Sequence, residues 1–241
     1  MRVHHVSSAP PGGGAARAGL RLHRGLSQLA DIESLWLDAD VLPDTLRTRQ
    51  LRAPRNHAFC WNRVRRWHWR GTLNKGFAGT GTPYSNPIGR SDASVFQGIP
   101  RPDIWNLHWV ANHFDWERLL PWLAEQAPIV WTLHDTNPLM GVWHFVPFPA
   151  ELNANRRRVE QEAVKFKTKI LSRIPKDRLT FVAPSEWMLE LCRRSPVTEG
   201  FPVIHIPGGL DTEVFSPKDK EIAQSMFAIP NDVMVLGFAA Q

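Results

Sequence analysis

The chain has 241 residues, of which 43% are hydrophobic and 22% are charged, and this is typical of a globular protein that can bury a core. Its 29 lysines and arginines against 23 aspartates and glutamates give a formal charge of +6, which favours anionic partners such as nucleic acid, an acidic membrane surface or phosphorylated small molecules. No stretch of the sequence approaches the roughly 20 apolar residues that a membrane-spanning helix needs.

The first element expected is a short strand over Arg2–Ser7. A loop rich in proline and glycine follows at 10–14, and then a helical pattern over 15–30, in which leucines recur between arginines. In this loop Gly13 and Gly14 would let backbone amides approach a ligand, and the start of the helix would favour a phosphate or carboxylate. A plain strand-to-helix turn explains the glycines equally well.

A second strand is expected at Glu33–Leu37, and the pattern then becomes irregular over 40–100, where arginines cluster around Trp61, Trp67 and Trp69. Three interpretations fit this segment. The favoured one is a solvated helix with its tryptophans packed inward; the next is contact with an anionic membrane or a lipid-linked pyrophosphate. Single-stranded nucleic acid comes last, since no nucleic-acid-binding motif supports it, and we do not expect it as a partner.

A strand, a helix and a second strand follow at a spacing typical of a βαβ unit. The first strand, Asp103–Leu107, ends in His108 and Trp109, and the second, Ile129–Leu133, ends in His134 and Asp135. Leucines and Trp116 mark the helix between them, which Pro121 could divide in two. A βαβ unit implies a parallel sheet with a right-handed crossover. Both histidines are therefore expected at carboxyl ends of strands, where α/β proteins bind ligands.

The alternation of helices and strands continues to the last residues. Beyond an aromatic loop at 141–149, the expected elements are a basic helix at Glu151–Ile174, a strand at Leu179–Ala183, a helix at Glu186–Arg193 begun by Ser185, a strand at Val203–Ile206, a helix at Lys218–Phe227 and a strand at Val233–Phe238. We expect an α/β, Rossmann-like three-layer domain with a mainly parallel sheet at 1–206 and a linker at 207–217. Residues 218–241 are expected to begin a truncated second domain.

Four stretches stand in order along the chain: PPGGGAARAGLRLHRGL, DIWNLHWV, PIVWTLHDTNPLMG, and VAPSEWM with VIHIPGGLDTEVFSP. Together they resemble the N-terminal, acceptor-side half of family 4 (group 1) glycosyltransferases, retaining enzymes of the GT-B architecture. The branch that they resemble most builds bacterial exopolysaccharide, capsule and O-antigen. The resemblance implies a hexosyltransferase that takes a nucleotide-sugar donor, needs no metal, and acts on a glycan or lipid-linked acceptor.

The resemblance also implies roles for individual residues. Gly13 and Gly14 would approach the donor phosphates, and His134 would sit beside the reacting sugar with Asp135 orienting it. The acceptor would meet His108, Trp109, Trp143 and His144, and the hinge between the two domains would be Gly208, Gly209 and Asp211. The cysteines that related enzymes carry after the histidine-aspartate pair are replaced here by Trp143, His144 and Phe148, so acceptor choice is expected to differ. Because the donor-binding half does not occur within 241 residues, this chain is expected to be inactive alone.

Two other classes of function remain open on the sequence. One is a metal-dependent hydrolase that uses His108, His113, His134, Asp135 and His144, although their spacing is not that of a helical zinc motif. The other is a non-catalytic module that binds a polyanion or a membrane, or a degenerate fragment without function. With only Cys60 and Cys192 present, no disulfide framework is expected and a reducing cytoplasm is favoured, with peripheral contact at the inner face of the membrane.

Overall fold

Parallel strands and helices alternate along the chain. The computed structural model describes residues 1–10, 12–38, 47–51, 64–67, 69, 71, 73, 76–77, 79–217 and 219–237. Its strands are β1 (Arg2–Ser7), β2 (Glu33–Asp38), β3 (Thr48–Gln50), β4 (Ile104–Leu107), β5 (Ile129–Thr132), β6 (Leu179–Ala183) and β7 (Val203–His205). Its helices are α1 (Gly14–Ser27), α3 (Trp116–Gln126), α4 (Ala154–Leu171), α5 (Glu186–Arg194) and α6 (Lys220–Met226), with 3-10 turns at Ala93–Phe96, Pro149–Glu151 and Lys176–Arg178.

The strands form one sheet, and within the described residues it has seven strands in the order β3-β2-β1-β4-β5-β6-β7. Every neighbouring pair is parallel, so the expected α/β, Rossmann-like three-layer class is confirmed and the sheet is parallel throughout. The order runs one way from β1 to β3 and the other way from β4 to β7. The point of reversal therefore lies between β1 and β4, and ligands bind at such points in open α/β sheets.

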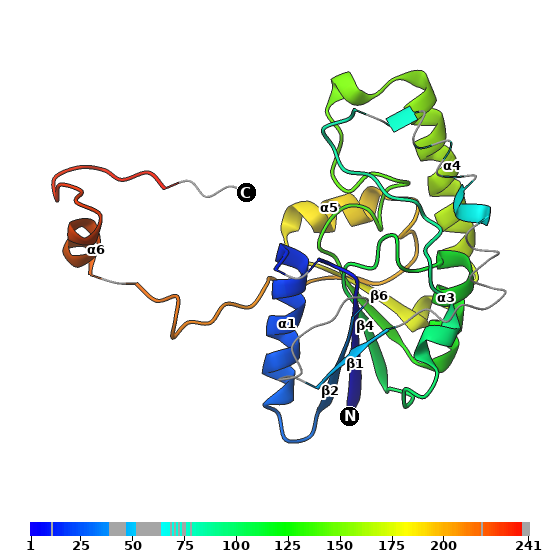
Figure 1. Cartoon of the computed structure of the whole chain (residues 1–241), viewed down its shortest axis with the longest axis horizontal. Helices are drawn as coiled ribbons and strands as arrows, with labels where there is room; N and C mark the ends of the chain where they lie inside the picture. Colours follow the sequence, from blue (N-terminus) through cyan, green and yellow to red (C-terminus); the bar gives the residue numbers. More distant parts are fainter. Residues whose placement is uncertain are drawn as a thin grey trace. The chain divides into compact units, whose positions relative to one another are not determined.

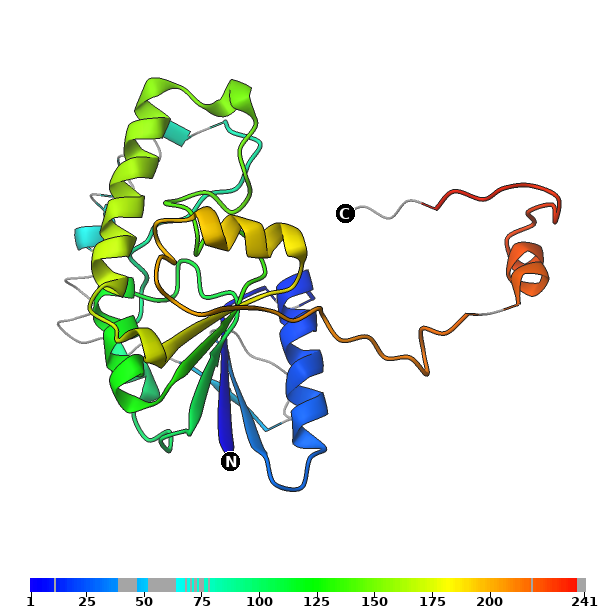
Figure 2. The same cartoon turned by 180° about the vertical axis from the view of Figure 1, so that it is seen from behind.

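Helices cover both faces of the sheet, with α1 on one side and α3 and α4 on the other (Figures 1 and 2). Alternation along β4 sends Trp105 and Leu107 into the core under α3, and Asn106 and His108 to the face under α1. Gly19 brings α1 close to the sheet, because a Cβ there would lie 2.6 Å from the ring of Trp36 and 3.0 Å from His108 Nδ1.

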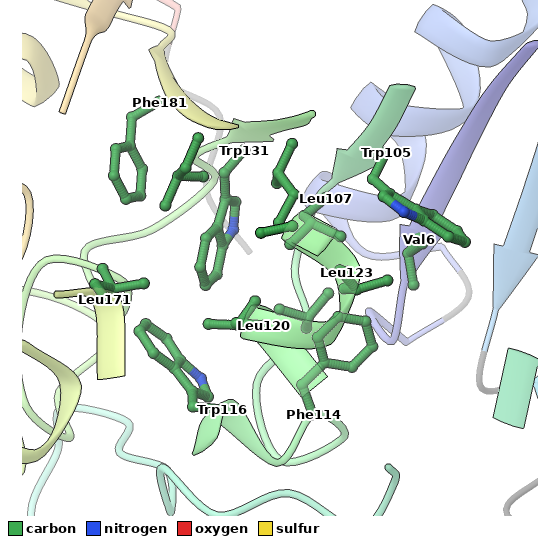
Figure 3. Packing of buried hydrophobic residues seen from close by; sticks show 14 of the residues in the cluster. Val6, Trp105, Leu107, Phe114, Trp116, Leu120, Leu123, Trp131, Leu171 and Phe181 are labelled. Carbon is green, nitrogen blue, oxygen red and sulfur yellow. The ribbon is translucent and has the colours of Figure 1, made fainter. Parts of the chain in front are cut away.

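The main core lies between the sheet and the helices α3, α4 and α5. Trp131 of β5 and Phe181 of β6 stack with ring centroids 5.9 Å apart, and Trp116 of α3 meets Trp131 at 5.0 Å. Figure 3 shows these rings pointing toward one another, with Leu120 and Leu171 beside them. Full burial of aromatic and aliphatic side chains on this scale contributes about 1.5–3 kcal/mol for each one.

Tryptophans contribute to the interior on both faces of the sheet, and Trp105, Trp116 and Trp131 belong to this core. Among the described residues, Trp36, Trp105, Trp116, Trp131 and Trp143 are all buried. In the arginine- and tryptophan-rich segment, Trp69 packs against Phe166, whereas Trp67 is 75% exposed. Arg65 bonds to Asp115 at 3.0 Å and also to Glu117. Trp61 and half of the eight arginines clustered at 47–70, namely Arg52, Arg55, Arg63 and Arg70, lie outside the described residues.

Three expectations are wrong in detail. The segment 40–100, expected to be irregular, contains the strand β3, which pairs with β2. The sequence did not predict this strand, because three residues are too few to show the alternation of a strand. Pro121 does not divide its helix, because α3 runs unbroken over Trp116–Gln126 and its buried leucines offset a proline cost of about 3 kcal/mol. No strand forms over 233–237, the described part of the strand expected at Val233–Phe238, because a strand needs a hydrogen-bonded neighbour.

The chain separates into two compact units, Met1–Gly208 and Gly209–Gln241. The boundary falls inside the linker expected at 207–217 and between two of the three expected hinge residues, Gly208 and Gly209. The third, Asp211, accepts hydrogen bonds from the backbone of Glu213 and Val214 and so organises a local turn. The second unit contains the helix α6, capped by Asp219.

Candidate functional site

Three pairs of residues singled out in the sequence lie just beyond the carboxyl ends of β1, β4 and β5, which are neighbours in the sheet: Gly13 with Gly14, His108 with Trp109, and His134 with Asp135. The loop after β1 is joined to the loop after β4, since the backbone N–H of Ser8 donates to the carbonyl of Trp109 at 2.7 Å. The Ser8 hydroxyl bonds to the same carbonyl and to that of Ala111. The glycine loop, His108 with Trp109, and His134 with Asp135 therefore follow three adjacent strands at one edge.

The glycine loop leads directly into α1. Gly13 is the N-cap, with φ −66° and ψ 156°, and it supplies no capping side chain. Gly12 has φ +84°, a conformation that glycine adopts without strain. The first turn of α1, which begins at Gly14, contains no acidic residue. Its backbone N–H groups and the positive end of the helix dipole are suited to a phosphate or carboxylate.

A chain of hydrogen-bonded imidazoles runs from this edge into the interior. His134 Nε2 lies 3.0 Å from His108 Nδ1, and His108 Nε2 lies 3.1 Å from His5 Nδ1. His5 Nδ1 also lies 3.0 Å from Asn106 Oδ1. His5 and His108 are buried, whereas His134 is only partly buried, so the chain begins at the surface and ends beneath α1.

Asp135 belongs to a second network. Its Oδ2 accepts from His144 Nδ1 at 2.5 Å and from the indole N–H of Trp109 at 2.6 Å, and its Oδ1 accepts from the backbone of Asn137. His144 Nε2 lies 2.5 Å from the hydroxyl of Ser85. The order serine, histidine, aspartate is that of a hydrolase triad, but Ser85 and His144 are buried and neither lines the cavity beside Asp135.

Asp135 and His134, although adjacent in sequence, have different partners. The family resemblance implies that Asp135 orients His134, but the ring of His134 is bonded by His108 and the carboxylate of Asp135 is bonded by His144 and Trp109. Because successive side chains leave a strand end in opposite directions, neighbours in sequence need not share a network.

Three of the four residues expected to meet the acceptor are buried. Trp143 is fully buried against Phe77, with ring centroids 4.8 Å apart, in a small second core. His108 is 2% exposed and serves the imidazole chain. Trp109, partly buried, and His144, buried, join the Asp135 network instead.

A small cavity of about 10 Å³ lies against the strand ends and is lined by His108, Trp109, His134, Asp135 and Asn137 together with apolar side chains. That volume is enough for about one water molecule. A larger depression of about 870 Å³ lies at the opposite edge, around the turn 27–34. We assign the site to the carboxyl edge, because parallel sheets bind ligands there and the chemically capable side chains lie there.

Burial keeps the three histidines of the imidazole chain neutral near pH 7. Burial lowers the pKa of His5 to about 3. Burial, with help from His5, His134 and His23, lowers the pKa of His108 well below its ordinary value. Burial also lowers the pKa of His134, and Asp135 opposes this effect.

Helix α4 braces the loop that follows Asp135. The fully buried Lys167 donates from Nζ to the carbonyls of Asn137 and Met140 at 2.6 and 2.9 Å, and it lies 4.5 Å from the ring centroid of Trp116. Glu160 accepts from the backbone of Gly141 and Val142 at 2.5 and 2.8 Å. Burial lowers the pKa of Lys167 to about 7, while Glu160 and Asp135 favour its charged form.

Sequence reasoning missed His5, Asn106, Ser85 and Lys167. His5 and Asn106 carry a weak signal, because both are polar residues inside apolar strands. Ser85 and Lys167 carry none, because their segments are rich in polar and basic residues. The described residues contain no group of three or more histidine, cysteine, aspartate or glutamate side chains arranged to hold a metal ion.

Comparison with protein-family models gives no match for this chain, and comparison with curated proteins gives none either. Within the described part of the chain, no helix is both long enough and apolar enough to cross a membrane.

Proposed function

We propose that this chain is the acceptor-side domain of a retaining glycosyltransferase that takes a nucleotide-sugar donor and transfers a hexosyl group to a glycan or lipid-linked acceptor. The family resemblance of the four motifs suggests this activity. One observation carries the proposal. The strands β1, β4 and β5 are adjacent in the sheet, and they are followed by the glycine loop, by His108 with Trp109, and by His134, respectively. Three of the resembling motifs thus converge at the point where the strand order reverses, as a ligand site in this fold requires.

The chemistry of transfer fits the groups at this edge. The bond from the sugar to the diphosphate must break and a bond to a hydroxyl oxygen of the acceptor must form. Negative charge grows on the leaving phosphate, which takes up the proton of that hydroxyl. The uncapped start of α1, from Gly14 onward, offers backbone N–H groups to that charge, whereas the N–H of Gly13 donates to the carbonyl of Pro10 at 3.0 Å. His134 is proposed to contact the sugar, and Trp109, beside Asp135, to flank the acceptor. Under this proposal the diphosphate is held by amides and side chains, and no metal is needed.

An exposed apolar loop supports peripheral contact with an anionic membrane, where a lipid-linked acceptor would be found. Phe145 and Val146 are each 53% exposed and Phe148 is 72% exposed. Arg157 and Arg158, exposed at the start of α4, follow closely in sequence. Apolar side chains next to arginines are suited to the boundary between lipid headgroups and acyl chains.

The test uses the polypeptide expressed from its complete natural reading frame, incubated with radiolabelled nucleotide-sugars and lipid-linked acceptors. We expect label to move to the acceptor, and His134→Ala to lower kcat by about 10²-fold, the typical loss for a group that stabilises the reacting centre. The matched control is His205→Ala, whose ring is partly exposed on the edge strand β7 and pairs with Glu186 at 2.9 Å. The proposal would be overturned if no nucleotide-sugar transferred label to an acceptor, or if both variants lost kcat equally.

A further inference from the structure

The proton positions along the imidazole chain follow from one amide at its inner end. Asn106 Nδ2 lies 3.0 Å from the carbonyl oxygen of Val130 and 3.0 Å from Thr132 Oγ1. A backbone carbonyl can only accept a hydrogen bond, so the NH₂ group of Asn106 must face it. The Oδ1 of Asn106, which can only accept, therefore faces His5.

This orientation fixes the next two rings. Because Asn106 Oδ1 accepts, His5 Nδ1 must carry a hydrogen; the reverse arrangement would set two lone pairs against each other at 3.0 Å. That hydrogen also faces His108 Nε2 at 3.1 Å, so His108 Nε2 is an acceptor. A neutral imidazole carries one N–H, and the hydrogen of His108 is therefore on Nδ1.

The same argument reaches the surface. His108 Nδ1 donates to His134 Nε2 at 3.0 Å, so His134 Nε2 is an acceptor that is already used. The hydrogen of neutral His134 is then on Nδ1. All three rings share one tautomer, with the hydrogen on Nδ1. The carbonyl of Val130, by orienting Asn106, sets the direction in which hydrogen bonds are donated along the chain.

A separate observation agrees with this assignment. Among the described residues, His5 Nε2 is buried and has no hydrogen-bond partner. In the assigned tautomer this atom holds a lone pair, and an unpaired buried acceptor is tolerated better than an unpaired N–H group. The groups that face His108 are His5 from β1, His23 from α1 and His134 after β5, and each of them disfavours a positive charge there.

We propose that Asn106, His5 and His108 are positioning residues that hold His134 neutral with its proton on Nδ1, so that His134 acts as a hydrogen-bond donor and not as a base. The ligand group that such a ring recognises is an acceptor oxygen, such as a sugar hydroxyl or a phosphate oxygen. Identifying that oxygen with a nucleotide-sugar rests on the proposed function, but the tautomer itself does not.

The first experiment measures ring nitrogen chemical shifts in the unmodified, ¹⁵N-labelled protein at pH 7 without any ligand. We expect His5, His108 and His134 each to show a protonated Nδ1 and an unprotonated Nε2. A protonated Nε2 on His134 would overturn the inference. Because no nucleotide-sugar is present, this result is independent of whether the protein transfers sugar.

A pair of variants tests the positioning role. His5→Phe removes the hydrogen that makes His108 Nε2 an acceptor, so the fraction of His134 with its proton on Nε2 should rise at least severalfold. His4→Phe is the matched control, because His4 is the neighbouring buried histidine of β1 and packs on Trp105 outside the chain. An unchanged tautomer in a folded His5→Phe protein, or the same change in both variants, would contradict the role.

Discussion

His144 donates from Nδ1 to Asp135 Oδ2 across 2.5 Å, and it joins the loop at 141–149 to the end of β5. This bond decides the role of Asp135. Its carboxylate holds a loop in place, while the adjacent His134 belongs to a different network.

Asp135→Asn should therefore destabilise the fold more than the loss of a surface charge would. The amide presents one acceptor oxygen where the carboxylate presents two, and these accept from His144, Trp109 and Asn137. We expect the free energy of unfolding to fall by about 1–3 kcal/mol, as for a buried polar group left without its partner. Urea denaturation measures it. Ser85→Ala, which removes only the hydroxyl at His144 Nε2, should cost about 1 kcal/mol, and equal losses would contradict this ranking.

Lys167→Met should loosen the loop after Asp135. The variant keeps an apolar stem beside Trp116 but leaves the carbonyls of Asn137 and Met140 without their shared donor. We expect a loss of about 1–3 kcal/mol at pH 7 and faster amide hydrogen exchange across 136–142. Exchange unchanged in that loop would show that Lys167 does not hold it.

Lys167 should also give stability a pH dependence. Its pKa is about 7 in the folded protein against an ordinary 10.5, so between these values the folded state binds fewer protons than the unfolded state. Stability contributed by this group therefore rises with pH across that window. Compared with wild type, Lys167→Met should lack this rise, and parallel curves of unfolding free energy against pH from 7 to 10 would refute it.

Acid should weaken the fold through its buried histidines. Burial lowers the pKa of His4 to about 4 and that of His5 to about 3, so below pH 6.5 the unfolded chain takes up protons that the folded chain does not. Stability then falls as pH drops from about 6.5 toward 4. His4→Phe should reduce the slope of unfolding free energy against pH by up to about 1.4 kcal/mol per pH unit, which corresponds to one proton. The same slope in both proteins would contradict a neutral His4.

Gly19→Ala tests how closely α1 approaches the imidazole chain. The added Cβ would lie 2.6 Å from the ring of Trp36 and 3.0 Å from His108 Nδ1, so we expect a loss of about 1–3 kcal/mol from overpacking. Gly25→Ala in the same helix meets nothing within 4 Å and should be neutral or stabilise by up to about 1 kcal/mol. Thermal or urea unfolding compares the two, and a neutral Gly19→Ala would mean that α1 can shift outward freely.

Most of the fold could be predicted from the sequence. The bounds of β1 and β6 are those expected, and Ser185 caps α5 by accepting from the backbone of Met188. These features depend on short-range patterns: apolar runs between turn residues, and a hydroxyl before a helical repeat. The strand β3 could not be predicted, because its three residues are held by pairing with β2 and not by a pattern of their own.

The sequence by itself determined that the sheet is mainly parallel, that its strands alternate with helices, and that His108, His134 and Asp135 stand at carboxyl ends of strands. It did so because strand and helix periods and the βαβ spacing are local properties of a chain. Only the tertiary structure decided that His134 bonds to His108, 26 residues away, and that His144 bonds to Ser85, 59 residues away. Such pairings depend on the paths of loops and on which side chains the close-packed layers leave within 3 Å of each other, and no local pattern encodes those.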